Sequence, residues 1–449
     1  MGADILRQSG AFRVRGTARP CTFQPQDERE LFRAFAPSAN FLPPFRPAGA
    51  RSAATDCNST TAGTVVDLTT LNAIRDINLN EFTVTVQPGV RIRELATELA
   101  SQGLELEGCH DLMDRTVGGA VAGGCIGPAI GGDGGLFAAQ LCRAKLLTPS
   151  GAPLEVDASK NNLLSALRLS YGMLGVLYEL TLRVRPVRPF SANHRRCTIS
   201  EFAAISDKIA RSPAGVRFWL MPFRDRVYLD LRRHDSSSAE GGRLPWRIKD
   251  WGESTVLPHV FKSLKHIVPV KGVRYRLIDE ISSITQGLVN NRLVEHGSNS
   301  TIQTGGAHTQ TLNYSTWLFP AADFAIVVRA YQEFCLRIRN ETGFRCDMPT
   351  MGFRLNRDPS ALLSPMFDEA MIALRAISTQ SAGWEDFAID FAGFAEHWGG
   401  VPLFNQSRSL SQDHARQVFG ERIEFFRKVR RRLDPENRMM NPFLSQYFL

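Results

Sequence analysis

The segment that most limits what this chain can fold into is a glycine-dense stretch from Thr116 to Gly135. It holds nine glycines and one charged side chain. Glycine lets a backbone approach a flat or anionic ligand closely and adopts dihedral angles that are closed to other residues. A flexible linker would be polar and would lack core elements at its flanks. Here Val121 interrupts the glycines and a strand-like segment, 144–148, follows. We therefore expect a ligand-binding loop.

Length and composition limit the class of protein. The chain has 449 residues, more than the roughly 250–300 that one core usually serves, so we expect two domains. Its net charge of +8 is modest for this length and does not call for nucleic acid. The eight cysteines show no CxxC pair, which favours reduced thiols over a disulfide frame or a metal site. No signal pattern or membrane-spanning apolar run is present, so we expect a cytoplasmic protein, with peripheral contact at the inner membrane face left open.

Hydrophobic periodicity divides the chain near residue 188. In the first part we expect strands at 63–68, 82–87, 144–148 and 176–184 and a helix at 90–99. Pro186 and Pro189 then break the pattern. In the second part we expect strands within 217–231, 311–319 and 350–355 and helices at 323–339, 384–395 and 413–433. Sheet and helix alternate without a repeat, which indicates an α+β fold.

Two loops have the composition of a phosphate-binding site. The first, Gly49–Ala54, combines small residues with one hydroxyl, Ser52, and one cation, Arg51. Successive backbone N–H groups in such a turn form a concavity that binds anions. The second is Thr116–Gly119. No GxGxxG enters a helix after a first strand, which argues against a Rossmann site. Taken alone, the first loop is equally an ordinary surface turn.

In this order, the segments 47–58, 63–68, 86–89, 116–122 and 172–176 resemble the FAD-binding domain (PCMH-type) of the vanillyl-alcohol oxidase superfamily. The second half is similar to the sugar-oxidising branch, which comprises aldonolactone oxidases, alditol oxidases and decaprenylphosphoryl-ribose oxidases. That similarity rests on Arg354 with Ser364-Pro365, on 399–402 and on 432–442. It implies a two-domain α+β fold: an FAD-binding domain at 15–188, and a mixed-sheet substrate domain at 189–449 whose C-terminal segment returns to the first.

The resemblance also implies the cofactor contacts. The first loop would wrap the FAD pyrophosphate, and the glycine segment would line the isoalloxazine and its phosphate arm. These contacts would come from Gly49, Ala50, Arg51, Ser52, Ala53, Thr116, Val117, Gly118, Gly119, Ala122 and Ile126, with Gly175 and Val176 closing over the flavin. Many relatives attach FAD to a histidine in the first loop. Arg51 stands there in this chain, so we expect non-covalent FAD.

Three polar groups that the branch places around the substrate hydroxyl are missing. Ile126 replaces a histidine, Gly352 a glutamate and Gln406 a lysine. The remaining catalytic candidates are Arg354, Gln406 and Asn405. A guanidinium has no acceptor capacity, so Arg354 would hold an anionic flavin or polarise an oxygen.

Other roles stay open for these residues. Arg354 equally fits a structural ion pair with Asp358. Asn405 and Gln406 can orient an oxygen but cannot act as a base. The proton carriers open to choice are His308, His397 and Tyr314, each of which is equally an ordinary packed or surface residue.

The stretch 246–276 carries two tryptophans and several cations. Two interpretations remain open: a solvated face, or contact with an anionic membrane surface. We expect Pro258 and Pro269 to break any long helix in it.

By resemblance, the expected function is FAD-dependent oxidation of a hydroxyl by hydride transfer to flavin N5. The substrate would be a sugar, polyol, sugar lactone or lipid-linked sugar. Two alternatives remain: desaturation or reduction of a lipid carbon–carbon bond, which the missing polar groups favour, and flavin binding without turnover. The sequence leaves the electron acceptor and the oligomeric state open.

Overall fold

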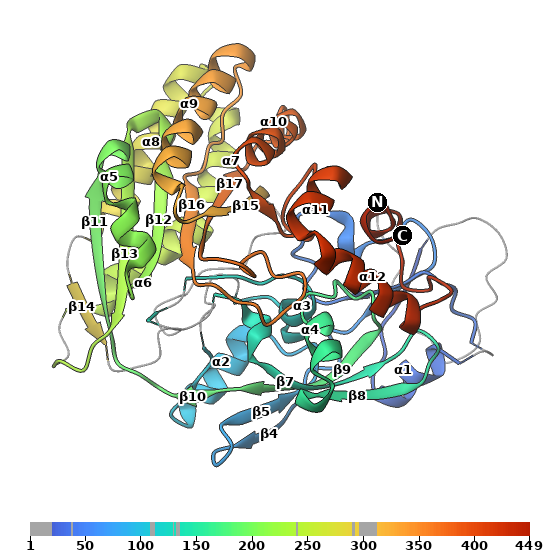
Figure 1. Ribbon diagram of the computed structural model, residues 1–449. Helices are drawn as coiled ribbons and strands as arrows, with labels where there is room; N and C mark the ends of the chain where they lie inside the picture. Colours follow the sequence, from blue (N-terminus) through green and yellow to red (C-terminus); the bar gives the residue numbers. More distant parts are fainter. Residues whose placement is uncertain are drawn as a thin grey trace.

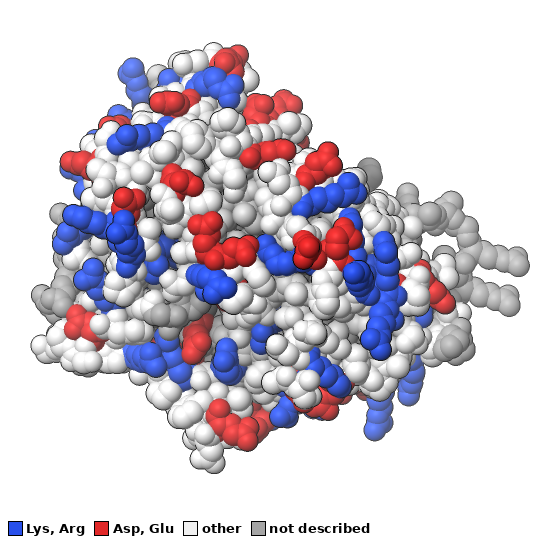
Figure 2. Space-filling view, viewed as in Figure 1, with Lys and Arg blue, Asp and Glu red and all other residues white. Residues whose placement is uncertain are grey.

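The computed structural model describes residues 20–449, except 37–38, 108–112, 129, 132–134, 239–240, 290–291 and 296–311. Figure 1 shows two parts, each built around a sheet, with the C-terminal helices α11 (Gln412–Phe419) and α12 (Glu421–Leu433) lying over the first part. The α+β class expected from the sequence is confirmed. On the face shown in Figure 2, Lys and Arg are interspersed with Asp and Glu, so the net positive charge is not gathered in one patch there.

The first part contains three sheets, the smallest of which pairs β6 (Leu104–Glu105) with β10 (Arg185–Pro186). A parallel sheet has the order β1 (Cys21–Phe23), β3 (Thr64–Asp67), β2 (Phe45–Ala48). An antiparallel sheet has the order β4 (Ile74–Asn78), β5 (Thr83–Val86), β9 (Val176–Arg183), β7 (Leu141–Leu147), β8 (Pro153–Asp157). Helices α1 (Glu28–Ala34), α2 (Ile92–Ser101), α3 (Val117–Ala122) and α4 (Asn161–Leu167) complete it. Alternation in β5 buries Val84 and Val86, which explains why this strand was readable from the sequence.

The second part is an eight-stranded antiparallel sheet. Its order is β14 (Arg292–Glu295), β11 (Phe190–Cys197), β13 (Arg226–His234), β12 (Gly215–Met221), β16 (Thr350–Leu355), β17 (Met371–Ser378), β15 (Asn313–Pro320), β18 (Val401–Pro402). Helices α5 (Ile199–Arg211) and α9 (Phe324–Thr342) cover one face, where Phe202, Phe218 and Phe324 meet. Helix α10 (Trp384–His397) packs beside α9 through its phenylalanines.

The opposite face is covered by α6 (Arg243–Trp251), α7 (Leu257–Ile267) and α8 (Lys271–Gly287). Phe261 and Ile278 of α7 and α8 pack against Tyr314 of β15. Our expectation that Pro258 and Pro269 break any long helix holds for Pro269, which lies between α7 and α8. It is wrong for Pro258, because α6 continues into α7 through a π-helical segment, Gly252–Val256. Pro258 lies at the start of α7, where the wider turn before it accommodates a residue without an N–H.

The C-terminal segment returns to the first part. Phe45 N donates to Arg438 O at 2.7 Å, and Asn441 Nδ2 donates to the carbonyls of Asp56 and Ser59 at 2.7 and 2.6 Å. Helix α13 (Pro442–Phe448) follows. The single helix expected over 413–433 is instead two helices, because Gly420 between them has a φ of +50° and ends the helical path. No helix in the described ranges is long and apolar enough to cross a membrane.

Candidate cofactor and active site

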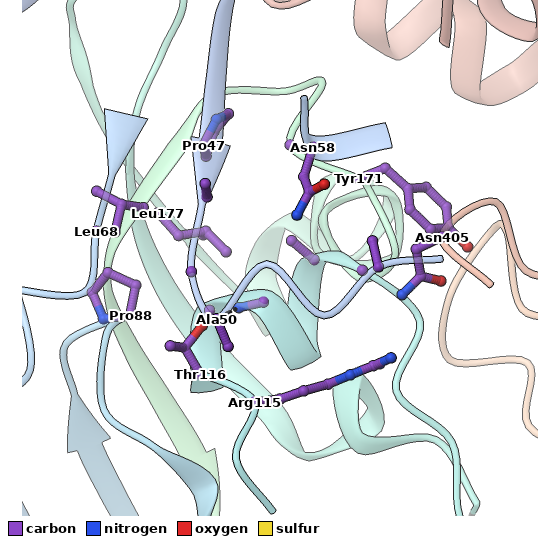
Figure 3. A pocket seen from close by; sticks show the side chains of 18 of the residues that line it. Pro47, Ala50, Asn58, Leu68, Pro88, Arg115, Thr116, Tyr171, Leu177 and Asn405 are labelled. Carbon is purple, nitrogen blue, oxygen red and sulfur yellow. Dashed lines mark hydrogen bonds between the residues drawn. The ribbon is translucent and has the colours of Figure 1, made fainter. Parts of the chain in front are cut away.

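An open cavity of about 800 Å³ lies among the first loop, the start of α3, the turn before β9, and one residue of the second part, Asn405. Figure 3 shows Thr116, Arg115, Tyr171 and Asn405 around it. Of the residues predicted to contact the cofactor, those lining this cavity are Gly49, Ala50, Arg51, Ser52, Ala53, Thr116, Gly118, Gly119, Ala122 and Gly175. Val117, Ile126 and Val176 do not line it; their side chains are fully buried in the hydrophobic core.

Two glycines let the first loop, α3 and a neighbouring turn approach each other. A Cβ on Gly49 would lie 2.0 Å from Thr116 Oγ1, and a Cβ on Gly118 would lie 2.6 Å from Pro88 Cβ. Thr116 caps α3 by accepting from Gly119 N at 3.3 Å. Gly119 is exposed in the cavity wall, where an added Cβ would meet only Thr116 Oγ1, at 3.0 Å. Gly118 is therefore required by the protein's own packing, whereas Gly119 leaves space for a ligand.

The buried side chain of Arg46 holds segments of the cavity wall in place. Its buried guanidinium donates to the carbonyls of Cys57, Tyr171 and Met439, each at 2.5 Å. Burial lowers the pKa of Arg46 to about 10, so the side chain still carries its charge at neutral pH. It joins two cavity segments to the returning C-terminus. No sequence pattern marks Arg46, because its partners lie up to 393 residues away.

Arg115 joins the two parts of the protein at the cavity. It donates to Ser52 Oγ at 3.1 Å, to Gly124 O at 3.1 Å and to the Tyr314 hydroxyl at 3.4 Å. Tyr314 in turn donates to Ser52 O at 2.5 Å. The side chain is buried and lines the cavity, so it places a positive charge where an anionic ligand would lie. Its position directly before Thr116 is the feature of the sequence that points to it.

The Gly124 carbonyl accepts hydrogen bonds from residues of both parts of the protein. Besides Arg115, it accepts from Asn405 Nδ2 at 3.2 Å and from Gln406 Nε2 at 2.7 Å. Gln406 is fully buried, and its Oε1 accepts from Thr316 Oγ1 at 3.1 Å and from Arg375 Nη2 at 3.2 Å. The amide oxygen of Gln406 accepts from two donors and its amide nitrogen donates to the Gly124 carbonyl, so the side-chain amide is held in one orientation. A buried polar cluster therefore connects β15 and β17 to the glycine segment beside the cavity.

Arg354 does not belong to this cluster. Strand pairing places Met351 opposite Arg375, and Arg375 opposite Thr316, so these three share the face that meets the cluster. Arg354 points to the other face of β16, where it donates to Ala210 O, Ala214 O and Asn356 Oδ1 at 3.3, 3.5 and 2.8 Å. Side chains alternate along a strand, so a residue three positions from Met351 faces the helices α5 and α9.

The same alternation corrects our interpretation of Gly352. An added Cβ there would lie 2.1 Å from Phe218 Cζ, inside the packing of α5 and α9. A glutamate at this position would have no room and would not face the cavity. The carboxylate of Asp358 accepts from Ser360 N at 2.9 Å, and burial lowers the pKa of Arg354. The structure therefore places the Arg354 guanidinium among backbone carbonyls beside α5, and Arg375 is the cation of the cluster.

The three suggested proton carriers fall in different places. Tyr314 lies at the first loop, as described above. His397 is exposed at the end of α10, against Trp398. His308 lies outside the described residues. Tyr314 is thus the member of this set whose hydroxyl the described structure brings to the cavity wall.

The residues that line the cavity are suited to binding FAD. Gly119 leaves space in the wall that a side chain would fill, and Arg115 supplies a cation there. Asn405 Oδ1 is buried and accepts no hydrogen bond from any described residue, so it is available to a bound donor. An isoalloxazine presents both donors and acceptors along one edge, which suits an amide whose oxygen is unused. The described residues contain no cluster of His, Cys, Asp and Glu that could hold a metal ion.

Comparison with known families agrees with this fit. The FAD binding domain family matches residues 20–157, and the D-arabinono-1,4-lactone oxidase family matches residues 180–447. The second match covers more than half of the chain. The fold and the site thus define a flavoprotein with a PCMH-type FAD-binding domain. Within that class, the chain belongs to the D-arabinono-1,4-lactone oxidase family, and the expected FAD cofactor and sugar-oxidising branch are confirmed.

Curated relatives match over different lengths. L-gulono-1,4-lactone dehydrogenase from Mycobacterium tuberculosis is 27% identical over 207 residues, which is 45% of this chain and 46% of that protein. L-gulonolactone oxidase from Mus musculus is 21% identical over 393 residues, or 86% of each chain. The match to the mycobacterial relative therefore spans about half of its length, whereas the match to the mouse relative spans most of it.

Solved structures share the fold across nearly the whole chain. Cholesterol oxidase from Brevibacterium sterolicum has a TM-score of 0.76 at 14% identity and covers 95% of this chain and 94% of its own. Xylooligosaccharide oxidase from Myceliophthora thermophila has a TM-score of 0.65 at 12% identity, with 96% and 92% covered. These likenesses establish the fold.

One buried histidine makes the stability of the second part depend on pH. His194 of β11 packs among Tyr228, Trp219 and Trp246, with ring centroids 5.9, 5.9 and 6.1 Å away. Burial, assisted by the nearby Lys249 ammonium, lowers its pKa to about 4. Because the folded pKa is below the unfolded value of about 6.5, the stability from the neutral ring is full above about pH 6.5 and is lost as the pH falls towards 4.

We expect His194→Phe to remove most of this acid sensitivity. The difference in unfolding free energy between pH 7.5 and 4.5, measured by urea titration, should shrink by up to about 3 kcal/mol. The exposed His397→Phe is the matched control and should leave the difference unchanged. An unchanged pH dependence in His194→Phe would show that other groups govern it.

Proposed function

We propose that this protein oxidises a hydroxyl of a sugar lactone, with the hydride passing to N5 of non-covalent FAD. The observation that carries the proposal is the buried polar cluster of Arg375, Gln406 and Asn405 beside the FAD cavity, in a chain of the D-arabinono-1,4-lactone oxidase family. A lactone presents a carbonyl and several hydroxyls. A pocket that hydrogen-bonds such groups strongly rejects analogues that lack them.

Each residue of the cluster has a separate task in this proposal. FAD, when bound, supplies the acceptor of the hydride. Asn405 orients a polar group at the cavity through its unused Oδ1. Gln406 accepts from Arg375 and donates to the Gly124 carbonyl, and so fixes their positions relative to each other. The Arg375 guanidinium stabilises negative charge that develops nearby, because preorganised charge acts strongly where water is excluded.

The lipid alternative receives less support. The two curated relatives described above are named as a lactone dehydrogenase and a lactone oxidase. Neither name refers to a reaction at a carbon–carbon double bond. The structure adds two buried cations at or beside the cavity, Arg115 and Arg375, which weakens the main reason for preferring an apolar substrate. We therefore favour lactone oxidation over desaturation or reduction.

The experiment is anaerobic reduction of the bound flavin by a substrate panel. Purified holoenzyme is mixed with aldono-1,4-lactones, the matching open-chain alditols and NADPH, and the visible absorption of oxidised flavin is followed. We expect bleaching by at least one lactone and a slower reaction or none with NADPH. Bleaching by NADPH alone would favour a reductase.

Non-covalent binding of FAD is a separate prediction. Arg51 lines the cavity where covalent relatives place a histidine, and it pairs with Asp67 at 3.2 Å. Among the described lining residues there is no histidine, and the pKa of the one thiol, Cys57, is raised by burial. Acid precipitation should release all flavin into the supernatant. Flavin fluorescence that migrates with the denatured polypeptide on a gel would contradict this.

A further inference from the structure

Exposed apolar side chains gather on the helices α6, α7 and α8. Of the 16 large hydrophobic side chains that are exposed in the described chain, nine lie between residues 244 and 288, about a tenth of its length. They are Leu244, Ile248, Trp251, Ile267, Val270, Val273, Leu277, Ile284 and Leu288. Scattered exposed apolar residues are normal, but such a concentration marks an interaction surface.

Three of these residues, including the most exposed of the nine, sit at the turn between α7 and α8. Ile267 is 71% exposed, Val270 61% and Val273 51%. The base of the same helical pair is buried, because Phe261 and Ile278 pack against the second sheet. In Figure 1, α7 and α8 lie in the upper part of the view and the five-stranded sheet lies at the bottom. The pair therefore has a fixed base and an apolar end that faces solvent.

Cations flank this apolar end. Lys262, Lys265, Lys271 and Arg276 are all exposed, and Glu280 is the one fully exposed acid on the same helices. Residues 243–288 contain eight Lys and Arg against four Asp and Glu. A two-fold contact between copies of this chain would bring the same patch, and hence like charges, together. An anionic surface instead complements both the charge and the apolar side chains.

We propose that α6–α8 dock on an anionic phospholipid bilayer, with the Ile267–Val273 turn entering the headgroup region. Lys262, Lys265, Lys271 and Arg276 would meet the lipid phosphates, and the apolar side chains of the turn would reach the start of the acyl chains. Amphipathic helices with this arrangement bind at the interface, where buried apolar area and electrostatic attraction add. This docking does not depend on which substrate the protein oxidises.

The test is flotation of the holoenzyme with vesicles of phosphatidylcholine alone or mixed with phosphatidylglycerol, at low and high salt. We expect binding to the mixed vesicles, weakened by salt. Ile267→Ser/Val270→Ser/Val273→Ser should lower binding tenfold or more. Lys265→Gln and Lys271→Gln should each lower it about fivefold, the value of one cation near such a surface. Ile326→Ser and Ile389→Ser, at residues 58% and 59% exposed elsewhere, are the matched controls and should bind as wild type does.

Two outcomes would overturn the proposal. One is wild-type protein that does not float with anionic vesicles at low salt. The other is a wild-type dimer that the triple serine variant converts to monomer without any vesicle binding, which would make this surface a contact between copies. Flavin content and the thermal midpoint check that the variants are folded. If the triple variant does not fold, Val270→Ser and the salt dependence of the wild type carry the same test.

Discussion

Replacing Arg375 by methionine should slow substrate-dependent flavin reduction by about 10²-fold or more, the usual loss for one preorganised electrostatic group. Methionine keeps an unbranched apolar stem but removes the charged guanidinium that donates to Gln406 and Thr316. A second readout does not depend on turnover: the reduction potential of the bound flavin should fall, because a nearby cation stabilises the reduced, anionic form. Stopped-flow bleaching and a redox titration measure the two effects.

Arg354→Met is the matched control on the neighbouring strand. Arg354 donates to the carbonyls of Ala210 and Ala214, so its loss should cost about 1–3 kcal/mol of stability and leave the rate and the potential close to wild type. Arg375→Lys, which retains the charge, should recover part of the rate. If Arg354→Met slows reduction and shifts the potential while Arg375→Met does neither, the cation of the site has been misassigned.

Gly119→Val should weaken FAD binding about tenfold to a hundredfold, equivalent to about 1.4–2.8 kcal/mol. Gly119 is exposed in the cavity wall, and the added side chain would project into the space that FAD requires. The protein itself loses little, because the new Cβ meets only Thr116 Oγ1, at 3.0 Å. Titration of apoprotein with FAD measures the affinity, and the thermal midpoint of the apoprotein measures the stability.

Gly118→Val separates packing from binding. Its Cβ would overlap Pro88 at 2.6 Å, so we expect a large loss of apoprotein stability that excess FAD does not fully restore. The two adjacent glycines should thus fail in different ways, one in affinity and one in folding. Equal FAD affinity in Gly119→Val and wild type would show that this wall does not contact the cofactor.

The cofactor-binding residues could be predicted from the sequence because they lie in short contiguous segments. Gly49 and Gly118 are required where neighbouring segments approach closely, and nearly all of the residues predicted from these two segments line the cavity. Of the three exceptions, Val117 and Val176 lie directly beside cavity residues but point into the core, and Ile126, three positions beyond Gly123, is buried there as well. A contiguous motif identifies the segment, and only the backbone geometry decides which side chains face the ligand.

The catalytic half was harder because it depends on long-range register. A shift of one residue moves a strand's side chains to the opposite face. The resemblance identified β16 correctly, but it could not show that Arg354 faces α5 and that Arg375, one strand away, meets Gln406. Arg46 and Arg115 are similar cases, since their partners are backbone carbonyls or distant side chains without a sequence pattern.

A single-turnover reaction tests the central claim most directly. Holoenzyme is mixed anaerobically with one equivalent of an aldono-1,4-lactone that bleaches the flavin in the panel, and the product is analysed by mass spectrometry. We expect full bleaching and a product two hydrogens lighter than the lactone, with Arg375→Met bleaching about 10²-fold more slowly. Flavin that stays oxidised with every lactone, in protein that is folded and fully loaded with FAD, would contradict the proposed function.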